Sequence, residues 1–132
     1  MPLREEVTSW LHEAQADLRH AHTSLKAREY NWACFAAQQA AEKALKTAIL
    51  HILGEYPRGQ DLVKLYRTLK EHTTINLSEA KLSRLSAYYT QARYPNAGVE
   101  RPSEEITEEQ ALEAIDTAEE TLNEIRKALQ DP

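Results

Sequence analysis

The stretch Ala33–Lys46 reads ACFAAQQAAEKALK and is the most informative part of this 132-residue chain. Small residues recur in it at steps of three and four and continue beyond it to Ala48. That spacing places them on one face of an α-helix, and small side chains allow neighbouring helix axes to approach closely. We therefore predict a helix over about residues 29–53 that lies at the centre of a helical bundle.

The segments on either side of this stretch also have helical periodicity. After it, Gly54 offers a helix stop, and Asp61 can cap the free N–H groups of a short third helix. Before it, we predict a helix over about residues 3–27. Its apolar face is formed by Val7, Leu11, Ala14, Leu18, Ala21 and Leu25.

Two capping-box patterns mark the helices of the C-terminal half. Asn76 and Glu79 have the spacing that opens a helix, which should end near Arg93 because a proline follows two residues later. After a loop of roughly ten residues, Thr107 and Gln110 repeat the pattern at the start of the last helix. We predict an all-α antiparallel bundle of about five helices, as one domain over residues 1–132 with its core at about 3–130.

Composition excludes several classes of function. Hydrophobic residues make up 42% and charged residues 28%, with a net charge of −5, which is typical of a globular domain. The three glycines form no phosphate-binding loop, and the histidines lack the spacing of a metal site, so we expect no cofactor and no metal. The single cysteine, Cys34, lies among alanines and is expected to be buried. With no apolar run of about 18 residues, we expect a cytoplasmic protein that is not in a membrane.

The alanine-rich helix carries one candidate basic site. Lys43 and Lys46 lie on the same side as Gln39, with Glu42 adjacent. These groups could hold a phosphate. Alternatively, Glu42 and Lys46 form an ion pair one helical turn apart on a solvated face.

A second candidate site lies at the end of the fourth predicted helix, around Arg93. Tyr89 and Tyr94 flank this arginine. Aromatic rings beside a guanidinium can stack a nucleobase and bind its phosphate. Alternatively, Arg93 bonds to the last carbonyl groups of its helix while the tyrosines pack.

Three motifs together make the chain similar to the HEPN domain family: AQADL at 14–18, the alanine-rich stretch at 33–46, and ARYPN at 92–96. The resemblance runs from about Val7 to Leu129. It implies a helical bundle that usually dimerises and binds nucleotide or RNA. The Arg-Tyr-Pro sequence resembles the branch whose members pair with a minimal nucleotidyltransferase as a toxin–antitoxin couple.

The chain departs from this family at the catalytic motif. The resemblance implies that active members are metal-independent ribonucleases with Arg-x4–6-His near the end of a late helix, where histidine moves a proton and arginine stabilises the phosphate. Arg93 matches that arginine, but no histidine occurs after His72. An Arg-x4-His spacing does occur earlier, at Arg67 and His72, and keeps a ribonuclease as an alternative.

The sequence therefore favours a binding protein over an enzyme. We expect a homodimer that binds nucleotide or RNA and pairs with a separately encoded nucleotidyltransferase. Arg93 would contact the phosphate, Tyr89 and Tyr94 would stack, and Lys43 and Lys46 would add positive charge. The alternatives are a metal-independent endoribonuclease toxin using Arg67 and His72, and a non-catalytic structural adaptor.

Overall fold

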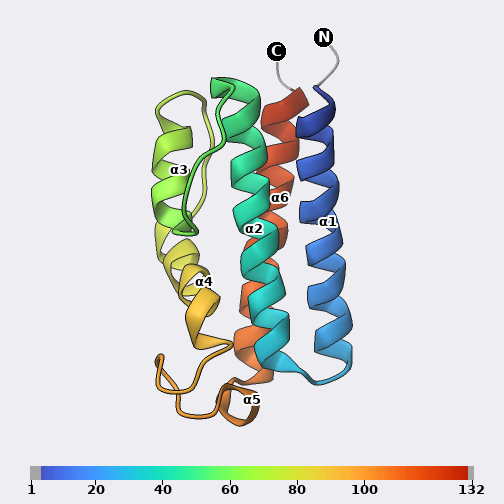
Figure 1. The fold of residues 1–132 in the computed structure, drawn as a ribbon, viewed down its shortest axis with the longest axis vertical. Coiled ribbons are helices and arrows are strands. Elements are labelled where there is room, and N and C mark those ends of the chain that lie inside the picture. Colours follow the sequence, from blue (N-terminus) through green and yellow to red (C-terminus); the bar gives the residue numbers. More distant parts are fainter. Residues whose placement is uncertain (1–3, 131–132) are drawn as a thin grey trace.

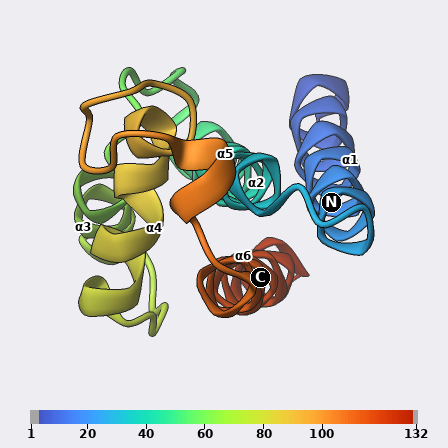
Figure 2. The same ribbon diagram turned by 90° about the horizontal axis from the view of Figure 1, so that it is seen from below.

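Helix α2 (Tyr30–Leu53) is the central element of the structure, a computed structural model that describes residues 4–130. Helices α1 (Glu5–Lys26) and α6 (Glu108–Gln130) pack along one side of it, and α3 (Leu62–Lys70) and α4 (Glu79–Gln91) along the other (Figures 1 and 2). No strand occurs within the described residues. The predicted all-α bundle with a central alanine-rich helix is confirmed.

The described part of the chain contains six helices, one more than the approximate number predicted. The additional helix, α5 (Pro102–Glu105), is a single turn inside the segment expected to be a loop. Pro102 is its first residue, where a fixed φ angle and a missing N–H suit a helix start. In Figure 1, α1 and α2 run in opposite directions, as do α3 and α4, whereas α6 returns parallel to α2.

Most helix ends lie where the sequence predicts them. The first helix begins at Glu5, and Leu3, the predicted start, lies outside the described residues. Gly54 ends α2 with a left-handed φ of 74°, and its N–H donates to the Leu50 carbonyl over 2.9 Å. The Asp61 carboxylate accepts hydrogen bonds from two backbone N–H groups at the start of α3.

The two predicted capping boxes have different outcomes. The one before α6 is confirmed, because Thr107 and Gln110 exchange side-chain to backbone hydrogen bonds of 2.9 and 3.2 Å. The one before α4 is wrong. Ser78 caps α4, accepting from the Lys81 N–H over 3.2 Å, while Glu79 forms an ion pair with Arg67.

The core is built around the small side chains of α2. Its alanines at positions 33, 37, 40, 41, 44 and 48 are fully buried, as are Ala14 and Ala21 of α1 and Ala118 of α6. Since alanine projects only a methyl group, the helix axes can approach closely. Larger side chains, including Leu45, Leu82 and Ile125, fill the remaining space.

Tyr66 connects α3 to the segment that leads into α4. Its buried hydroxyl donates to the Ile75 carbonyl over 3.1 Å and accepts from the Leu77 N–H over 3.0 Å. Replacing Tyr66 with phenylalanine keeps the ring but leaves both backbone groups without this partner. We expect a loss of about 1–3 kcal/mol in the free energy of unfolding, measured by urea denaturation. An unchanged urea midpoint would show that water replaces the hydroxyl without cost.

Candidate functional site

Arg93 lies just beyond the last turn of α4, with its guanidinium group among aromatic rings. The Arg93 Cζ atom is 4.5 Å from the ring centroid of Phe35, 4.7 Å from that of Tyr89 and 4.9 Å from that of Tyr94. Trp32 packs edge-on against Phe35, with centroids 6.0 Å apart. These five residues are called the Arg93 cluster below.

Only one nitrogen of the Arg93 guanidinium group donates a hydrogen bond to a described residue. Its Nε atom donates to the Tyr89 carbonyl over 2.8 Å, so the alternative in which Arg93 bonds to its own helix end is also realised. Among the described residues, neither terminal nitrogen has a hydrogen-bond partner and no carboxylate forms a salt bridge with the group. The aromatic contacts hold a planar cation in one orientation with two nitrogens free, a geometry suited to a phosphate.

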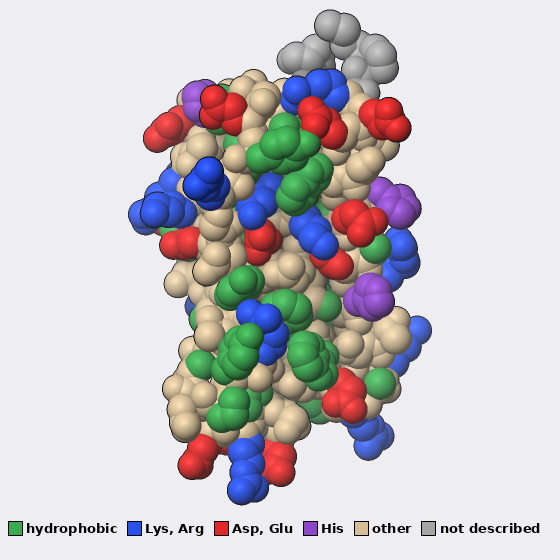
Figure 3. Space-filling view, viewed as in Figure 1, with side chains coloured by type: hydrophobic (Ala, Val, Ile, Leu, Met, Phe, Trp, Pro, Cys, Tyr) green, Lys and Arg blue, Asp and Glu red, His purple; other side chains and the backbone are tan. Residues whose placement is uncertain are grey.

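The cluster is accessible from solvent. Arg93 is half-buried, whereas the Tyr94 side chain is 51% exposed and that of Trp32 is 48% exposed. Figure 3 shows hydrophobic side chains gathered around a basic one on the lower part of this face, over the adjoining ends of α2 and α4. The cluster therefore lies on the surface, where a ligand can reach it.

A buried hydrogen bond fixes the end of α4 against the start of α2. The side-chain amide of Asn31, 6% exposed, donates to the Ala92 carbonyl over 3.1 Å. This contact joins residues that are 61 positions apart in the chain. It holds Arg93 beside the aromatic residues of α2.

A tight turn follows the cluster. The Asn96 N–H donates to the Val99 carbonyl over 3.0 Å, and Asn96 has a left-handed φ of 62°. Gly98 has a φ of 122°, and a Cβ atom there would lie only 2.6–2.8 Å from the Gln91 side chain. The left-handed φ favours glycine at this position, whereas the flexible Gln91 side chain could move away from an added Cβ atom. The turn returns the chain toward α5 directly after Tyr94.

Lys43 and Lys46 lie farther along α2, and both are paired with carboxylates. Lys43 Nζ is 2.7 Å from Asp17 Oδ2, and Lys46 Nζ is 2.9 Å from Glu42 Oε2. The predicted Glu42–Lys46 pair is therefore present, with both side chains only 13% exposed rather than on a solvated face. Lys43 lies about 12 Å from Phe35 along the helix axis, at 1.5 Å per residue.

Arg67 and His72 lie at the end of α3, which Figure 1 shows at the opposite end of the bundle from the end of α4. Two nitrogens of Arg67 donate to the Glu79 carboxylate over 2.7 and 3.2 Å. This hydrogen bonding raises the pKa of Arg67 and lowers that of Glu79. His72 is exposed. The structure does not bring this pair together with Arg93.

Sequence reasoning missed two members of the Arg93 cluster. Phe35 and Trp32 come from α2, more than 50 positions before Arg93, and were not assigned to the site. A weak signal was available, because Phe35 is the only phenylalanine of the chain and interrupts the small residues of α2.

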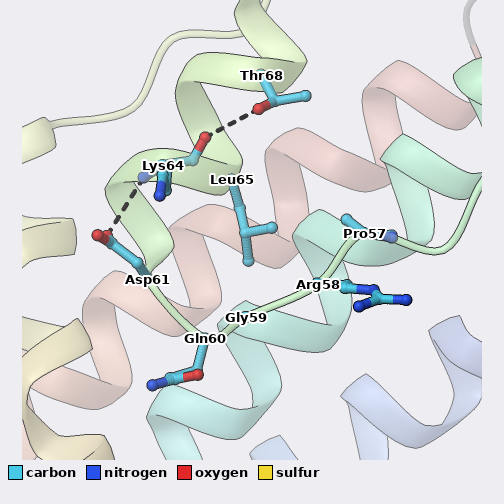
Figure 4. Close-up of a pocket in the computed structure, with 8 residues that line it drawn as sticks. All are labelled: Pro57, Arg58, Gly59, Gln60, Asp61, Lys64, Leu65 and Thr68. Carbon is cyan, nitrogen blue, oxygen red and sulfur yellow. Dashed lines mark hydrogen bonds between the residues drawn. The ribbon is translucent and has the colours of Figure 1, made fainter.

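A hollow with a volume of about 460 Å³ lies away from the Arg93 cluster, between α3 and the segment before it. Figure 4 shows that two of its polar side chains bond to the helix itself: the Asp61 side chain accepts from the Lys64 N–H, and the Thr68 hydroxyl donates to the Lys64 carbonyl. The Arg58, Gln60 and Lys64 side chains also line the hollow.

Cys34 and Tyr88 form a buried pair of titratable groups. Burial raises the pKa of the Cys34 thiol from 9.0 to about 12 and that of the Tyr88 hydroxyl from 10.0 to about 12. The predicted burial of Cys34 is confirmed. A thiol with this pKa is a poor nucleophile at neutral pH.

These shifts predict a loss of stability in alkali. Both folded-state pKa values exceed the unfolded ones, so the unfolded state loses protons first, and stability falls as pH rises from about 9 toward 12. The urea midpoint should therefore be lower at pH 10.5 than at pH 8. Cys34→Ala should remove the part of this decline that begins near pH 9. A midpoint that does not change with pH would contradict the burial of both groups.

The described residues contain neither a metal-binding group nor a membrane-spanning helix. Residues 4–130 contain no group of three or more His, Cys, Asp or Glu side chains placed to hold a metal ion. Over the same part of the chain, no helix has the length and apolar character needed to cross a membrane.

Comparison with known proteins gives the family. The HEPN domain family matches residues 7–128, so this chain belongs to the HEPN family. No curated protein matches it significantly.

Solved structures agree with this assignment. TT1696 from Thermus thermophilus is 34% identical with a TM-score of 0.85, covering 95% of this chain and 99% of its own. An archaeal HEPN homologue is 33% identical with a TM-score of 0.71, and the match covers 92% of this chain and 95% of the homologue. A HEPN domain protein from Thermotoga maritima is 25% identical with a TM-score of 0.71, and the match covers 94% of this chain and 99% of the Thermotoga protein.

Proposed function

We propose that this HEPN protein binds a nucleotide or RNA through the Arg93 cluster. The observation that carries the proposal is the guanidinium of the half-buried Arg93, whose Cζ atom lies within 4.9 Å of three aromatic ring centroids and whose two terminal nitrogens have no partner in the described residues. Arg93 contacts the phosphate, and the exposed ring of Tyr94 stacks with a base. Tyr89 fixes the orientation of Arg93 through its ring and its carbonyl.

The two lysines have a smaller part in this proposal. Lys43 and Lys46 are each paired with a carboxylate, so their charges are largely neutralised. They contribute to the electrostatic potential near α2 and do not contact the phosphate beside Arg93.

The proposed activity is binding rather than catalysis. Counted from Arg93, the family motif would place its proton-transferring histidine at positions 98–100, which hold Gly98, Val99 and Glu100, none of them a histidine. Arg67 is held by the Glu79 carboxylate, which leaves it less free to stabilise a phosphate. A ribonuclease built on Arg67 and His72 is therefore the less favoured alternative.

We further propose a homodimer that associates with a nucleotidyltransferase. The support is the family resemblance of the Arg-Tyr-Pro segment, together with exposed apolar side chains outside the Arg93 cluster that a partner could cover, among them Leu53 and Leu112. A structural adaptor would retain the protein partner without binding any nucleotide.

Calorimetric titration with mononucleotides and with short single-stranded RNA tests the proposal, alongside an RNA cleavage assay in EDTA. We expect saturable binding and intact RNA. Cleavage that is lost in the His72→Ala variant would establish the ribonuclease instead. No binding of either ligand, with association with a nucleotidyltransferase retained, would establish the adaptor.

A further inference from the structure

The Arg93 guanidinium lies between two groups of aromatic rings. The Phe35 and Tyr89 rings pack against each other with centroids 6.4 Å apart, and the Arg93 Cζ atom is 4.5 and 4.7 Å from these centroids. The Tyr94 centroid is 4.9 Å from the same atom, but within residues 4–130 its ring is in aromatic contact with neither of the other two. The guanidinium therefore separates Tyr94 from the packed pair of Phe35 and Tyr89.

An exposed ring lies at the outer end of each group. Tyr94 itself is 51% exposed. On the other side, Trp32 packs edge-on against Phe35 at an interplanar angle of 85° and is 48% exposed. This contact fixes the indole one ring away from the guanidinium, with about half of its surface open to solvent.

A groove between α1 and α2 provides room beside this indole. The groove has a volume of about 450 Å³, and its lining includes Trp32 and Phe35 from α2 and His20 from α1. The one carboxylate in the lining, that of Asp17, lies 2.7 Å from Lys43 Nζ, which offsets its negative charge. The groove therefore has space for a flat, uncharged ring next to Trp32.

Two exposed rings around one phosphate-binding group match the repeating unit of a nucleic-acid strand. An internal phosphodiester carries a nucleoside on both sides, whereas the phosphate of a mononucleotide carries only one. Bases of any type stack on exposed aromatic side chains, and each stacked base adds to the affinity. A mononucleotide would leave either Trp32 or Tyr94 unused, and a strand would use both.

We propose that the Arg93 cluster binds an internal phosphodiester of single-stranded RNA, with one base stacked on Tyr94 and the adjacent base stacked on Trp32. This inference rests on the proposed phosphate contact. The two terminal nitrogens of Arg93 donate to the two non-bridging oxygens of the phosphodiester. The base on Trp32 enters the α1–α2 groove, so the cluster selects a strand over a free nucleotide.

Calorimetry on the full chain with two ligands of equal charge tests this arrangement. The dinucleotide ApA has one phosphodiester between two nucleosides. The methyl ester of AMP has a phosphodiester of the same charge, in which a methyl group replaces one nucleoside. We expect ApA to bind roughly 5- to 100-fold more tightly than the methyl ester, which is the effect of one additional stacked base.

Variants of the two exposed rings identify where the bases bind. Trp32→Ala and Tyr94→Ala should each weaken ApA binding roughly 5- to 100-fold, while Trp32→Phe keeps a ring and should retain most of the affinity. Tyr56→Ala, which removes a 55% exposed ring outside the cluster, should leave ApA affinity unchanged. A loss in only one of the two alanine variants would overturn the proposal, because it would show that a single base is bound. Thermal unfolding verifies that each variant is folded.

The outcomes separate the two-base arrangement from the phosphate contact. If the methyl ester binds less tightly to Arg93→Ala than to the wild-type protein, but ApA binds no more tightly than the methyl ester, the two-base arrangement is wrong and the phosphate contact stands. If neither ligand binds, or if Arg93→Ala binds both as tightly as the wild-type protein does, the phosphate contact fails and this inference fails with it.

Discussion

The Arg93→Ala variant should bind phosphorylated ribose about 10- to 100-fold more weakly than the wild-type protein. The substitution removes a charge-assisted hydrogen bond to the phosphate, which contributes about 1.5–3 kcal/mol. The cost in stability should be smaller, about 1 kcal/mol, because Arg93 is half-buried at a helix end and the rings of Phe35 and Tyr89 stay packed against each other. Calorimetry with ribose 5-phosphate and GMP measures the first effect, and thermal unfolding measures the second.

Two further variants make this result interpretable. Arg84→Ala removes an arginine from the same helix that is already paired with Glu113, and it should leave phosphate affinity unchanged. Arg93→Lys keeps the positive charge but lacks the planar fork, so it should restore only part of the affinity. Equal affinity of the wild-type protein and Arg93→Ala would remove Arg93 from the site.

The Ala44→Leu variant should lose about 3 kcal/mol in the free energy of unfolding, near the upper end of the range for overpacked cores. Ala44 is fully buried at the middle of α2, which other helices surround. A leucine there has no free volume to enter, so it must displace a neighbouring helix or adopt a strained rotamer. Urea denaturation measures the loss.

The matched control for Ala44→Leu is Ala87→Leu, an exposed position inside α4. Alanine and leucine have similar helix propensities, so this variant isolates packing from backbone preference, and its stability should change little. If Ala44→Leu were as stable as the control, the close approach of the helices around α2 would not depend on small side chains.

The helical architecture could be predicted because its signals are local. The spacing of alanines in α2, the stop at Gly54 and the cap at Asp61 each depend on residues only a few positions apart. The error at the start of α4 has the same origin. Asn76 and Ser78 are both residue types that cap helices well. Glu79 accepts hydrogen bonds from Arg67, 12 positions earlier, instead of completing a capping box.

The site could be predicted only in part for the same reason. Tyr89, Arg93 and Tyr94 are neighbours at one helix end, so their grouping follows from helical geometry. Phe35 reaches Arg93 only through the packing of α2 against α4, as Asp17 reaches Lys43 only through that of α1 against α2. No pattern within a single helix specifies these contacts.

The most direct test of the account observes the Arg93 guanidinium itself. In a ¹⁵N-labelled protein, the Arg93 side-chain Nε–H resonance can be assigned by its loss in Arg93→Lys and followed during titration with ribose 5-phosphate. We expect a saturable shift of this resonance, with the Nε–H resonance of Arg84 unchanged. An Arg93 resonance that stays in place while the ligand reaches saturating concentrations would contradict a phosphate site at the end of α4.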